Sequence, residues 1–343
     1  MNDLYQKLKQ KLSDVMPEFE ISQKAAIAEK INGLKKQKNA VILGHNYMEP
    51  ALYLTIPDFT GDSLELCRKA ASTDSDIIVF CGVRFMAETA KILNPQKKVL
   101  IPSPKAGCSL AESITAADVR QLRQIYPGVP IVTYINTYAD VKAECDVCCT
   151  SGNAARVVES FGDQPVIFLP DEYLASNVAR ETGRKIIFPT KKPKGKSRQS
   201  PELNYHLVGW QGRCEVHEQF TVEDIENVRK QFPDVLILAH PECSPAVVDA
   251  SDFSGSTSEM LAYVRDVDAP RYLLLTECSM GDNIAAENPH REMLRLCSIR
   301  CPHMGEITLE DTLKALELDQ YEVTVPEDIR RRALASVERM LAI

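Results

Sequence analysis

The sequence predicts an α/β fold built from three repeated units, each with a parallel β-sheet. Short apolar runs, typical of strands buried on both faces, alternate with helical patterns along the chain. The same order of strand, polar turn and helix recurs three times. Polar residues follow directly after the predicted strands. Because ligands bind at the carboxyl ends of parallel strands, we expect the three units to build one central cavity.

Each predicted strand is a short apolar run that ends at a polar or turn-forming residue. The runs are residues 41–43, 76–80 and 98–101 in the first unit, 130–133 and 165–169 in the second, and 235–239 and 271–275 in the third. Residues 1–36 show a partial apolar stripe at helical spacing, which predicts a covering helix. Residues 311–343 are mostly helical, with 322–325 as a strand or linker, and we expect them to pack on the N-terminal unit.

Each unit places polar side chains after its first strand and hydroxyl side chains at a following helix start. These residues are His45, Tyr47 and Ser63 in the first unit, Tyr134, Asn136 and Ser151 in the second, and His240, Glu242, Ser256 and Thr257 in the third. The free N–H groups of a helix start bind carboxylate or phosphate, although each hydroxyl alone could be a simple N-cap. Three at matched positions favour a small polyanionic substrate.

The repeat predicts three domains. They are residues 1–110, completed by C-terminal helices in 305–343, then 111–215, and then 216–304. Residues 191–204 are basic, rich in Pro, Gly and Ser, and without periodicity, so we interpret them as a surface loop of the second domain. Phosphate contact by the lysines of this loop is the alternative.

Three isolated cysteines lie near the ends of the three thirds of the chain. They are Cys108, Cys214 and Cys301, about a hundred residues apart. Three thiolates can hold an iron–sulfur cluster and leave one iron open as a Lewis acid. The alternative is three buried structural thiols.

The remaining cysteines have other interpretations. The chain has eleven cysteines, an odd number that argues against a full disulfide framework. Cys145, Cys148 and Cys149 resemble half of a zinc site, but no second pair has suitable spacing, so we expect packed thiols. Cys297 and Cys301 could form a regulatory disulfide. The helix and strand patterns make Cys67 and Cys81 structural.

The composition restricts the class of protein. The chain has 343 residues, 44% of them hydrophobic and 26% charged, as in ordinary globular proteins. Its net charge of -8 argues against nucleic-acid binding. No apolar run approaches the roughly 18–20 residues of a membrane helix, and the N-terminus lacks the apolar core of a secretory signal. We expect a cytoplasmic protein that binds neither nucleic acid nor membrane.

With these residues assembled, the chain resembles the quinolinate synthase family from about residue 40 to residue 304. The resemblance rests on separate motifs that occur in the same order. They are GHNY (44–47), GDSLE (61–65), GVRFMAETAKIL (82–93), the Cys108 loop, YINT (134–137), TSGNA (150–154), WQGRCEVHE (210–218), HPE (240–242), GSTS (255–258) and CPHM (301–304).

The resemblance implies a fold and a reaction. The implied fold has three αβα sandwich domains around a pseudo-threefold axis, with the active site at the centre. The implied reaction condenses iminoaspartate, made by L-aspartate oxidase, with dihydroxyacetone phosphate, and it releases quinolinate, phosphate and water. The implied cofactor is a 4Fe-4S cluster with three cysteine ligands, whose open iron acts as a Lewis acid.

The resemblance also implies residue roles. Cys108, Cys214 and Cys301 match the cluster ligands. The implied substrate-binding set is His45, Ser63, Tyr134, Asn136, Ser151, His240, Glu242 and Thr257, with Met86 nearby and Ser256 next to Thr257. Tyr47, Tyr134, Glu242 and His240 are the candidates for moving protons.

Two features depart from the family, and two alternatives remain. The basic stretch 191–204 is additional to the compact form of the family, and the Cys297–Cys301 spacing differs from the C-x-x-C-x-x-C run of some members. The enzymes that build diphthamide also resemble a three-domain arrangement with one cluster cysteine per domain. They do not require the GHNY, HPE and GSTS motifs. A zinc-binding interaction module on Cys145–Cys149 would leave the matched polar residues unexplained.

Overall fold

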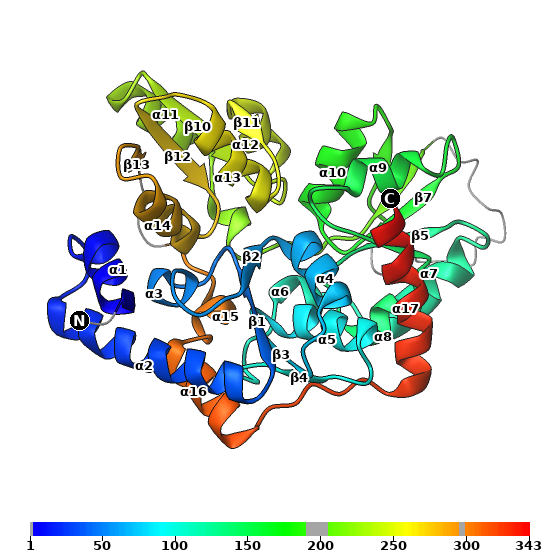
Figure 1. Ribbon diagram of the computed structural model, residues 1–343. Coiled ribbons are helices and arrows are strands. Elements are labelled where there is room, and N and C mark those ends of the chain that lie inside the picture. Colours follow the sequence, from blue (N-terminus) through cyan, green and yellow to red (C-terminus); the bar gives the residue numbers. More distant parts are fainter. Residues whose placement is uncertain (1–2, 190–204, 295–298) are drawn as a thin grey trace.

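The computed structural model describes residues 3–189, 205–294 and 299–343. Its three sheets are entirely parallel and are interleaved with helices (Figure 1), which confirms the predicted α/β class. We call each sheet with its flanking helices a unit, numbered in chain order. The basic stretch 191–204 and Cys297 lie outside the described residues.

The three sheets share one topology. The first contains β1 (Ala40–His45), β2 (Phe59–Gly61), β3 (Ile77–Cys81) and β4 (Lys98–Leu100), in the order β2-β1-β3-β4. The third contains β10 (Val235–Ala239), β11 (Phe253–Ser254), β12 (Arg271–Leu275) and β13 (Glu292–Leu294), in the order β11-β10-β12-β13. The second contains β5 (Ile131–Tyr134), β6 (Val147–Cys149), β7 (Val166–Leu169), β8 (Ile186–Ile187) and β9 (Leu207–Gly209), in the order β6-β5-β7-β9-β8. Apart from β8 at its edge, the second sheet repeats the other two.

Helices complete each unit. The first has α1 (Asp3–Leu12), α2 (Glu18–Gln37), α3 (Pro50–Tyr53), α4 (Ser63–Ser72), α5 (Arg84–Leu93) and α6 (Ser109–Glu112). The second has α7 (Ala116–Ile125), α8 (Ala139–Lys142), α9 (Ala154–Glu159) and α10 (Glu172–Glu181). The third has η1 (His217–Gln219), α11 (Val222–Gln231), α12 (Pro245–Ala250), α13 (Thr257–Asp266), α14 (Cys278–Glu287) and α15 (Pro302–Gly305), and α16 (Leu309–Leu318) and α17 (Glu327–Ala342) follow.

The sequence interpretation missed the second strand of every unit. β2, β6 and β11 are only two or three residues long, and Phe59 of β2 is exposed, so they were not recognised as buried strands; β6 (Val147–Cys149) is a buried apolar run that we had interpreted as leading into a helix. The single N-terminal helix that we expected is two helices, because Pro17 stands at the start of α2, where a proline lacks the N–H that a continuing helix needs.

One hydrogen-bond motif occurs in all three units. An aspartate just before the second strand accepts a hydrogen bond from a backbone N–H of the first strand, and its own N–H donates to the carbonyl of that same residue. A basic side chain from the helix before the first strand also binds the carboxylate. The trios are Asp58, Ile42 and Lys35; Asp146, Ile131 and Arg123; and Asp252, Ile237 and Arg229. The repeat therefore extends from topology to single contacts.

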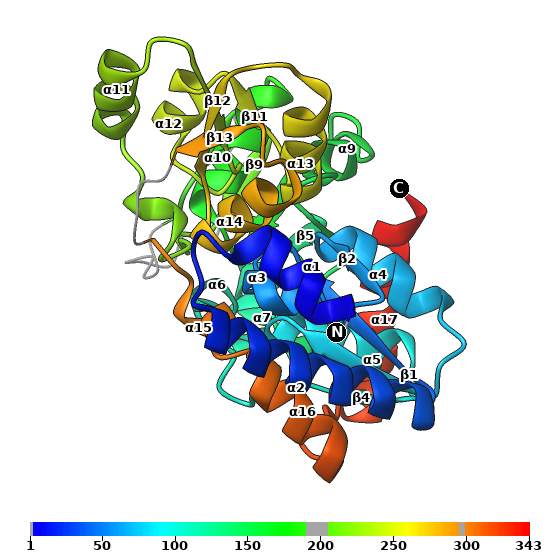
Figure 2. The ribbon, with the colours of Figure 1, turned by 60° about the vertical axis from the view of Figure 1, so that its left-hand side comes forward.

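The C-terminal helices divide between two units. α16 packs on α2 in both views (Figures 1 and 2), as we expected for the N-terminal unit. By contrast, α17 packs mainly on β6 and α8 of the second unit, with a smaller contact to α5. Arg332 bonds Glu144, and the Ser336 hydroxyl donates to the Lys142 carbonyl. The last helix therefore covers the second unit instead of completing the first, and the boundaries at 110/111 and 215/216 stay predictions.

The shared aspartate motif gives a test of the fold. We expect Asp252→Ala to lower the free energy of unfolding by about 1–3 kcal/mol, because the Ile237 N–H loses its acceptor. Asp252→Asn keeps an acceptor oxygen and loses only the half-exposed ion pair with Arg229, so it should cost no more than about 1 kcal/mol. Urea denaturation followed by circular dichroism measures both values. Equal losses would show that the charge, and not the acceptor, stabilises the turn.

Candidate active site

The first strand of each sheet delivers two polar side chains to a common cavity. β1 ends at His45 and is followed by Tyr47, and His240 and Glu242 follow β10 in the same way. The backbone N–H two residues after each histidine donates to its Nδ1, at 3.2 Å for His45 and 3.3 Å for His240. Burial lowers the pKa of His45 to about 4 and that of His240 to about 3. Both imidazoles are therefore neutral near pH 7, with the proton on Nε2.

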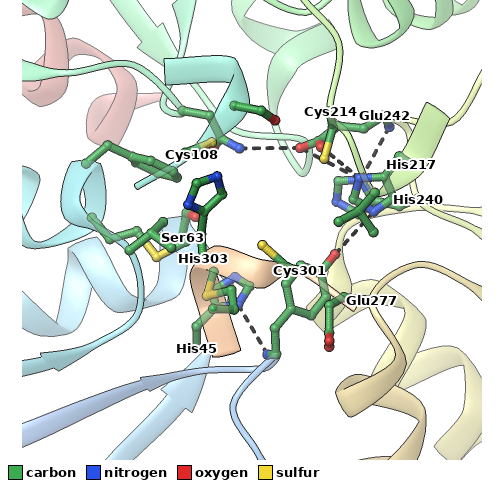
Figure 3. Close-up of a pocket in the computed structure, with 18 of the residues that line it drawn as sticks. His45, Ser63, Cys108, Cys214, His217, His240, Glu242, Glu277, Cys301 and His303 are labelled. Atoms are coloured by element: carbon green, nitrogen blue, oxygen red, sulfur yellow. Dashed lines mark hydrogen bonds and ion pairs between the residues drawn. The ribbon is translucent and has the colours of Figure 1, made fainter. Parts of the chain in front are cut away.

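The cavity lies where the three units meet, and its empty space together with the open solvent at its mouth amounts to about 700 Å³. Apart from Ser256, all thirteen predicted site residues line this cavity. They are His45, Tyr47, Ser63, Met86, Cys108, Tyr134, Asn136, Ser151, Cys214, His240, Glu242, Thr257 and Cys301. Figure 3 shows several of these side chains around the same space. The structure thus brings together residues from all three units, and their individual roles stay predictions.

Ser256 is the exception, because it caps a helix and does not line the cavity. Its hydroxyl accepts a hydrogen bond from the N–H of Glu259, and the Glu259 carboxylate accepts one from the N–H of Ser256. This is the capping box of α13. The simple N-cap alternative therefore describes Ser256, while Thr257, the first residue of α13, faces the cavity.

The cavity lining contains no lysine or arginine among the described residues. An anionic ligand would instead meet hydroxyls and N–H groups at helix starts, because Ser63 and Thr257 begin α4 and α13. Ser151, which we also expected at a helix start, lies instead in the turn before α9, whose first residue is Ala154. Thr257 is held by Asn46, whose side-chain amide donates to its Oγ1 at 2.9 Å. Asn136 also contributes a free acceptor, since its buried Oδ1 has no hydrogen-bond partner among the described residues.

The three isolated cysteines occupy matched places in the fold. Cys108 follows β4, Cys214 follows β9 and Cys301 follows β13, and each stands just before a short helix. Figure 3 shows the three around the same cavity. Burial raises the pKa of Cys108 to about 12 and that of Cys301 to about 11, and it raises the pKa of Cys214 well above its usual value.

This arrangement fits a thiolate-bound metal centre. Charge adds to burial for two of these thiols, because Cys301 raises the pKa of Cys108 and Cys108 raises the pKa of Cys214. Without a cation in the lining, three neighbouring thiolates are unfavourable, and a metal core supplies the missing positive charge. Soft thiolate donors suit iron–sulfur clusters.

The other described cysteines have structural surroundings. Cys145, Cys148 and Cys149 are buried free thiols in the second unit, where Cys145 bonds the Val141 carbonyl and Cys148 bonds Ser336. Within the described ranges, none of these three cysteines belongs to a group of three or more cysteine, histidine or carboxylate side chains that could hold a metal ion. Cys67 and Cys81 are also buried, as we expected. The Cys297–Cys301 disulfide that we considered falls partly outside the described residues.

A chain of hydrogen bonds joins the candidate proton-moving groups. The Tyr134 hydroxyl donates to Glu242 Oε1 at 2.5 Å, and Glu242 Oε2 lies 2.8 Å from His217 Nδ1. His217 Nε2 is 3.0 Å from the Thr276 hydroxyl, which is 2.5 Å from the Tyr47 hydroxyl. The chain therefore connects Tyr134 of the second unit to Tyr47 of the first through the third.

This network sets the charge of Glu242. Burial raises the pKa of the carboxyl, but His217 and the other donors outweigh burial and lower that pKa to about 2. Burial and the Glu242 charge both raise the pKa of Tyr134 and of Tyr47. At neutral pH the cavity therefore holds an ionised carboxylate that accepts a hydrogen bond from a protonated phenol.

Sequence reasoning missed His217 and Glu277. His217 lies three residues after Cys214 inside the WQGRCEVHE motif, so its spacing from the cysteine was the available signal. Glu277 follows β12 as Asp171 follows β7, and burial raises its pKa to about 7. The matched place of these two acidic residues was visible in the repeat.

The fold and the site define an α/β protein of three repeated units whose shared cavity suits a metal centre and a small anionic ligand. A family model described as "Quinolinate synthetase A protein" matches residues 29–342. The chain belongs to this family of enzymes of NAD biosynthesis, which confirms the resemblance seen in the motifs.

Curated relatives agree with the family match. The chain is 52% identical to quinolinate synthase 2 of Mesorhizobium japonicum over 329 residues, which cover 96% of this chain and 95% of the relative. It is 53% identical over 315 residues to the quinolinate synthases of Agrobacterium fabrum and Xylella fastidiosa. Those alignments cover 92% of this chain and 85% or 86% of the relatives. Within the described residues, no helix has the length and apolarity needed to cross a membrane.

The different places of Ser256 and Ser63 give a test. We expect Ser256→Ala to lower the free energy of unfolding by about 0.5–2 kcal/mol, because it removes the cap of α13. Ser63→Ala is the matched control. Ser63 follows the cap, and Asp62 caps α4, so this change should stay within about 0.5 kcal/mol of the wild type. Urea unfolding measures both, and a larger loss for Ser63→Ala would reverse the assignment of the two hydroxyls.

Proposed function

We propose that this chain is a quinolinate synthase, a transferase that condenses iminoaspartate with dihydroxyacetone phosphate to give quinolinate, phosphate and water. The observation that supports the proposal most is the meeting of Cys108, Cys214 and Cys301 at one cavity lined by matched polar residues of three units. The family match and the names of the relatives point to the same reaction.

Cys108, Cys214 and Cys301 would hold a 4Fe-4S cluster. When bound, the cluster supplies an open iron that acts as a Lewis acid. The loops after β4, β9 and β13 present these thiols from three units, so each unit contributes one ligand.

The substrate's anionic groups would bind to hydroxyls and helix starts. Ser151, in the turn before α9, and Thr257, at the start of α13, would hold carboxylates, and His45 and Ser63 would hold a carboxylate or a phosphate. The Oδ1 of Asn136, which has no hydrogen-bond partner in the described part of the chain, would accept a hydrogen bond from a substrate hydroxyl or nitrogen. Met86 closes part of the apolar wall.

Proton transfer would use the network around Glu242. The ionised carboxylate is a base that already contacts the Tyr134 hydroxyl, so it can accept a proton through that phenol. At the other end of the network, the Tyr47 hydroxyl shares a hydrogen bond with the Thr276 hydroxyl. His240 stays neutral and offers its Nε2 proton as a donor. These groups serve the isomerisation, ring closure and dehydration that the reaction requires.

The proposal includes a supply route and a location. Iminoaspartate is the product of L-aspartate oxidase, so we expect functional coupling between the two enzymes. A reducing cytoplasm suits the ten described cysteines, which are all free. The three domains that we predict would then each contribute one cluster ligand and one set of substrate contacts.

An anaerobic assay tests the function directly. Protein purified without oxygen should contain about four irons and four sulfides per chain, and it should form quinolinate from iminoaspartate and dihydroxyacetone phosphate. Four irons with cleavage of S-adenosylmethionine would instead indicate diphthamide chemistry. Zinc without any reaction would indicate a binding module.

The ligand assignment predicts a loss of cluster and activity together. Replacing Cys108, Cys214 or Cys301 by alanine should remove most of the iron and the activity, because each thiol is one of three ligands. Cys67→Ala removes a buried thiol outside the cavity and should keep both. Iron and sulfide analysis with the quinolinate assay measures this, and a brown, active Cys214→Ala variant would refute the assignment of Cys214.

The role of Glu242 predicts a slow enzyme that keeps its cluster. Glu242→Gln preserves the shape of the side chain but removes the charge, so kcat should fall by about 10²–10⁴-fold while the iron content stays unchanged. Glu218→Gln makes the same change in the exposed carboxylate that follows His217 in the sequence, and it serves as the control. A wild-type kcat for Glu242→Gln would remove this residue from the proton-transfer step.

A further inference from the structure

We propose that Cys214, His217 and Glu242 form a second metal site, which binds one zinc ion in the cluster-free chain and excludes the cluster while it is filled. The ligand atoms of the three side chains lie within 4.8 Å of one another. Figure 3 shows the trio on one side of the cavity. The site goes beyond the proposed function, because two of its three ligands take no part in holding the cluster.

The donor set is one that zinc prefers. A thiolate, an imidazole nitrogen and a carboxylate oxygen are the usual protein ligands of zinc, and three ligands leave a fourth position open. Tetrahedral zinc with normal bond lengths places its ligand atoms roughly 3.3–3.8 Å apart. The observed upper separation of 4.8 Å is therefore closed by side-chain movements of about 1 Å.

The fold supplies outer partners for two ligands. His217 Nδ1 faces Glu242 Oε2 at 2.8 Å, and the opposite nitrogen, Nε2, lies 3.0 Å from the Thr276 hydroxyl. A metal at Nδ1 leaves the Nε2 proton to be donated to Thr276. Glu242 Oε1 keeps its hydrogen bond from Tyr134 while Oε2 turns to the metal. Such outer hydrogen bonds orient metal ligands and strengthen binding.

The charges around the trio favour a cation. The carboxylate of Glu242 is buried, and the described lining has no lysine or arginine to compete for it. His240 stacks on His217 with ring centroids 4.6 Å apart. On binding, the Cys214 thiol releases its proton and its sulfur bonds the metal.

Because both metal centres use Cys214, the zinc ion and the cluster cannot be bound at the same time. A cluster needs this thiolate together with Cys108 and Cys301, whereas the zinc site needs it together with His217 and Glu242. Zinc bound to a chain that has lost its cluster, or has not yet received one, therefore blocks cluster insertion. The two sets of ligands can be separated by mutation, because only Cys214 belongs to both.

The test is a zinc titration of the full-length, cluster-free chain under anaerobic conditions, against a chromophoric chelator. We expect one tight zinc in the wild type and an unchanged affinity in Cys108→Ser, which cannot hold the cluster. His217→Ala should bind zinc at least about 100-fold more weakly and should still take up iron and sulfide. Cobalt in place of zinc should give a thiolate charge-transfer band that disappears in Cys214→Ser.

Two outcomes would overturn the site. Wild-type zinc affinity in His217→Ala would exclude His217 as a ligand, and an equal loss in Cys108→Ser would show that the cluster cysteines bind the zinc. Should His217→Ala fail to fold, Glu242→Gln must show the loss of zinc affinity instead. All these readings are independent of quinolinate formation, so a failure of the proposed enzymatic function leaves them unaffected.

A separate measurement tests whether bound zinc prevents assembly of the cluster. Zinc-loaded wild-type protein should assemble little cluster when iron and sulfide are added, and removal of zinc with EDTA should restore assembly. Cluster assembly at the normal rate with the zinc retained would contradict the exclusive use of Cys214.

Discussion

The ionised carboxylate of Glu242 is the interaction on which the site depends. It belongs to the third unit, accepts a hydrogen bond from Tyr134 of the second, and reaches Tyr47 of the first through His217 and Thr276. A buried charge is costly unless its hydrogen bonds are complete. The groups that bond the carboxylate itself come from the second and third units, so its hydrogen bonds are complete only when these two units are assembled around it.

The three units repeat the same backbone contacts closely, but the side chains that they place in the cavity differ. The aspartate motif at Asp58, Asp146 and Asp252 has nearly the same distances in all three units, because it stabilises the same turn. The strand ends differ, with imidazoles in two units and a phenol in the other. The thiols after the last strands are the exception, since each unit supplies a cysteine there, as the proposed cluster would need.

Much of this arrangement could be predicted from the sequence, since buried parallel strands give apolar runs and matched polar residues mark their ends. The strands β2, β6 and β11 could not be, because two or three residues carry no periodicity. Ser256 and Thr257 are adjacent hydroxyls, and only the helix geometry separates the cap from the cavity residue. His217 depends on a contact with Glu242, 25 residues away, which local pattern does not show.

The placement of α17 has a mechanical consequence. α16 rests on the first unit and α17 on the second, so one continuous segment fastens these two units into a common frame. The largest hydrophobic core also runs through both, and Ala286 and Met304 are its buried members from residues 216–304. The third unit has separate cores of its own. The first and second units therefore share one core and one C-terminal segment, whereas the third unit joins them through contacts largely outside that core, such as the hydrogen bond from Asn46 to Thr257.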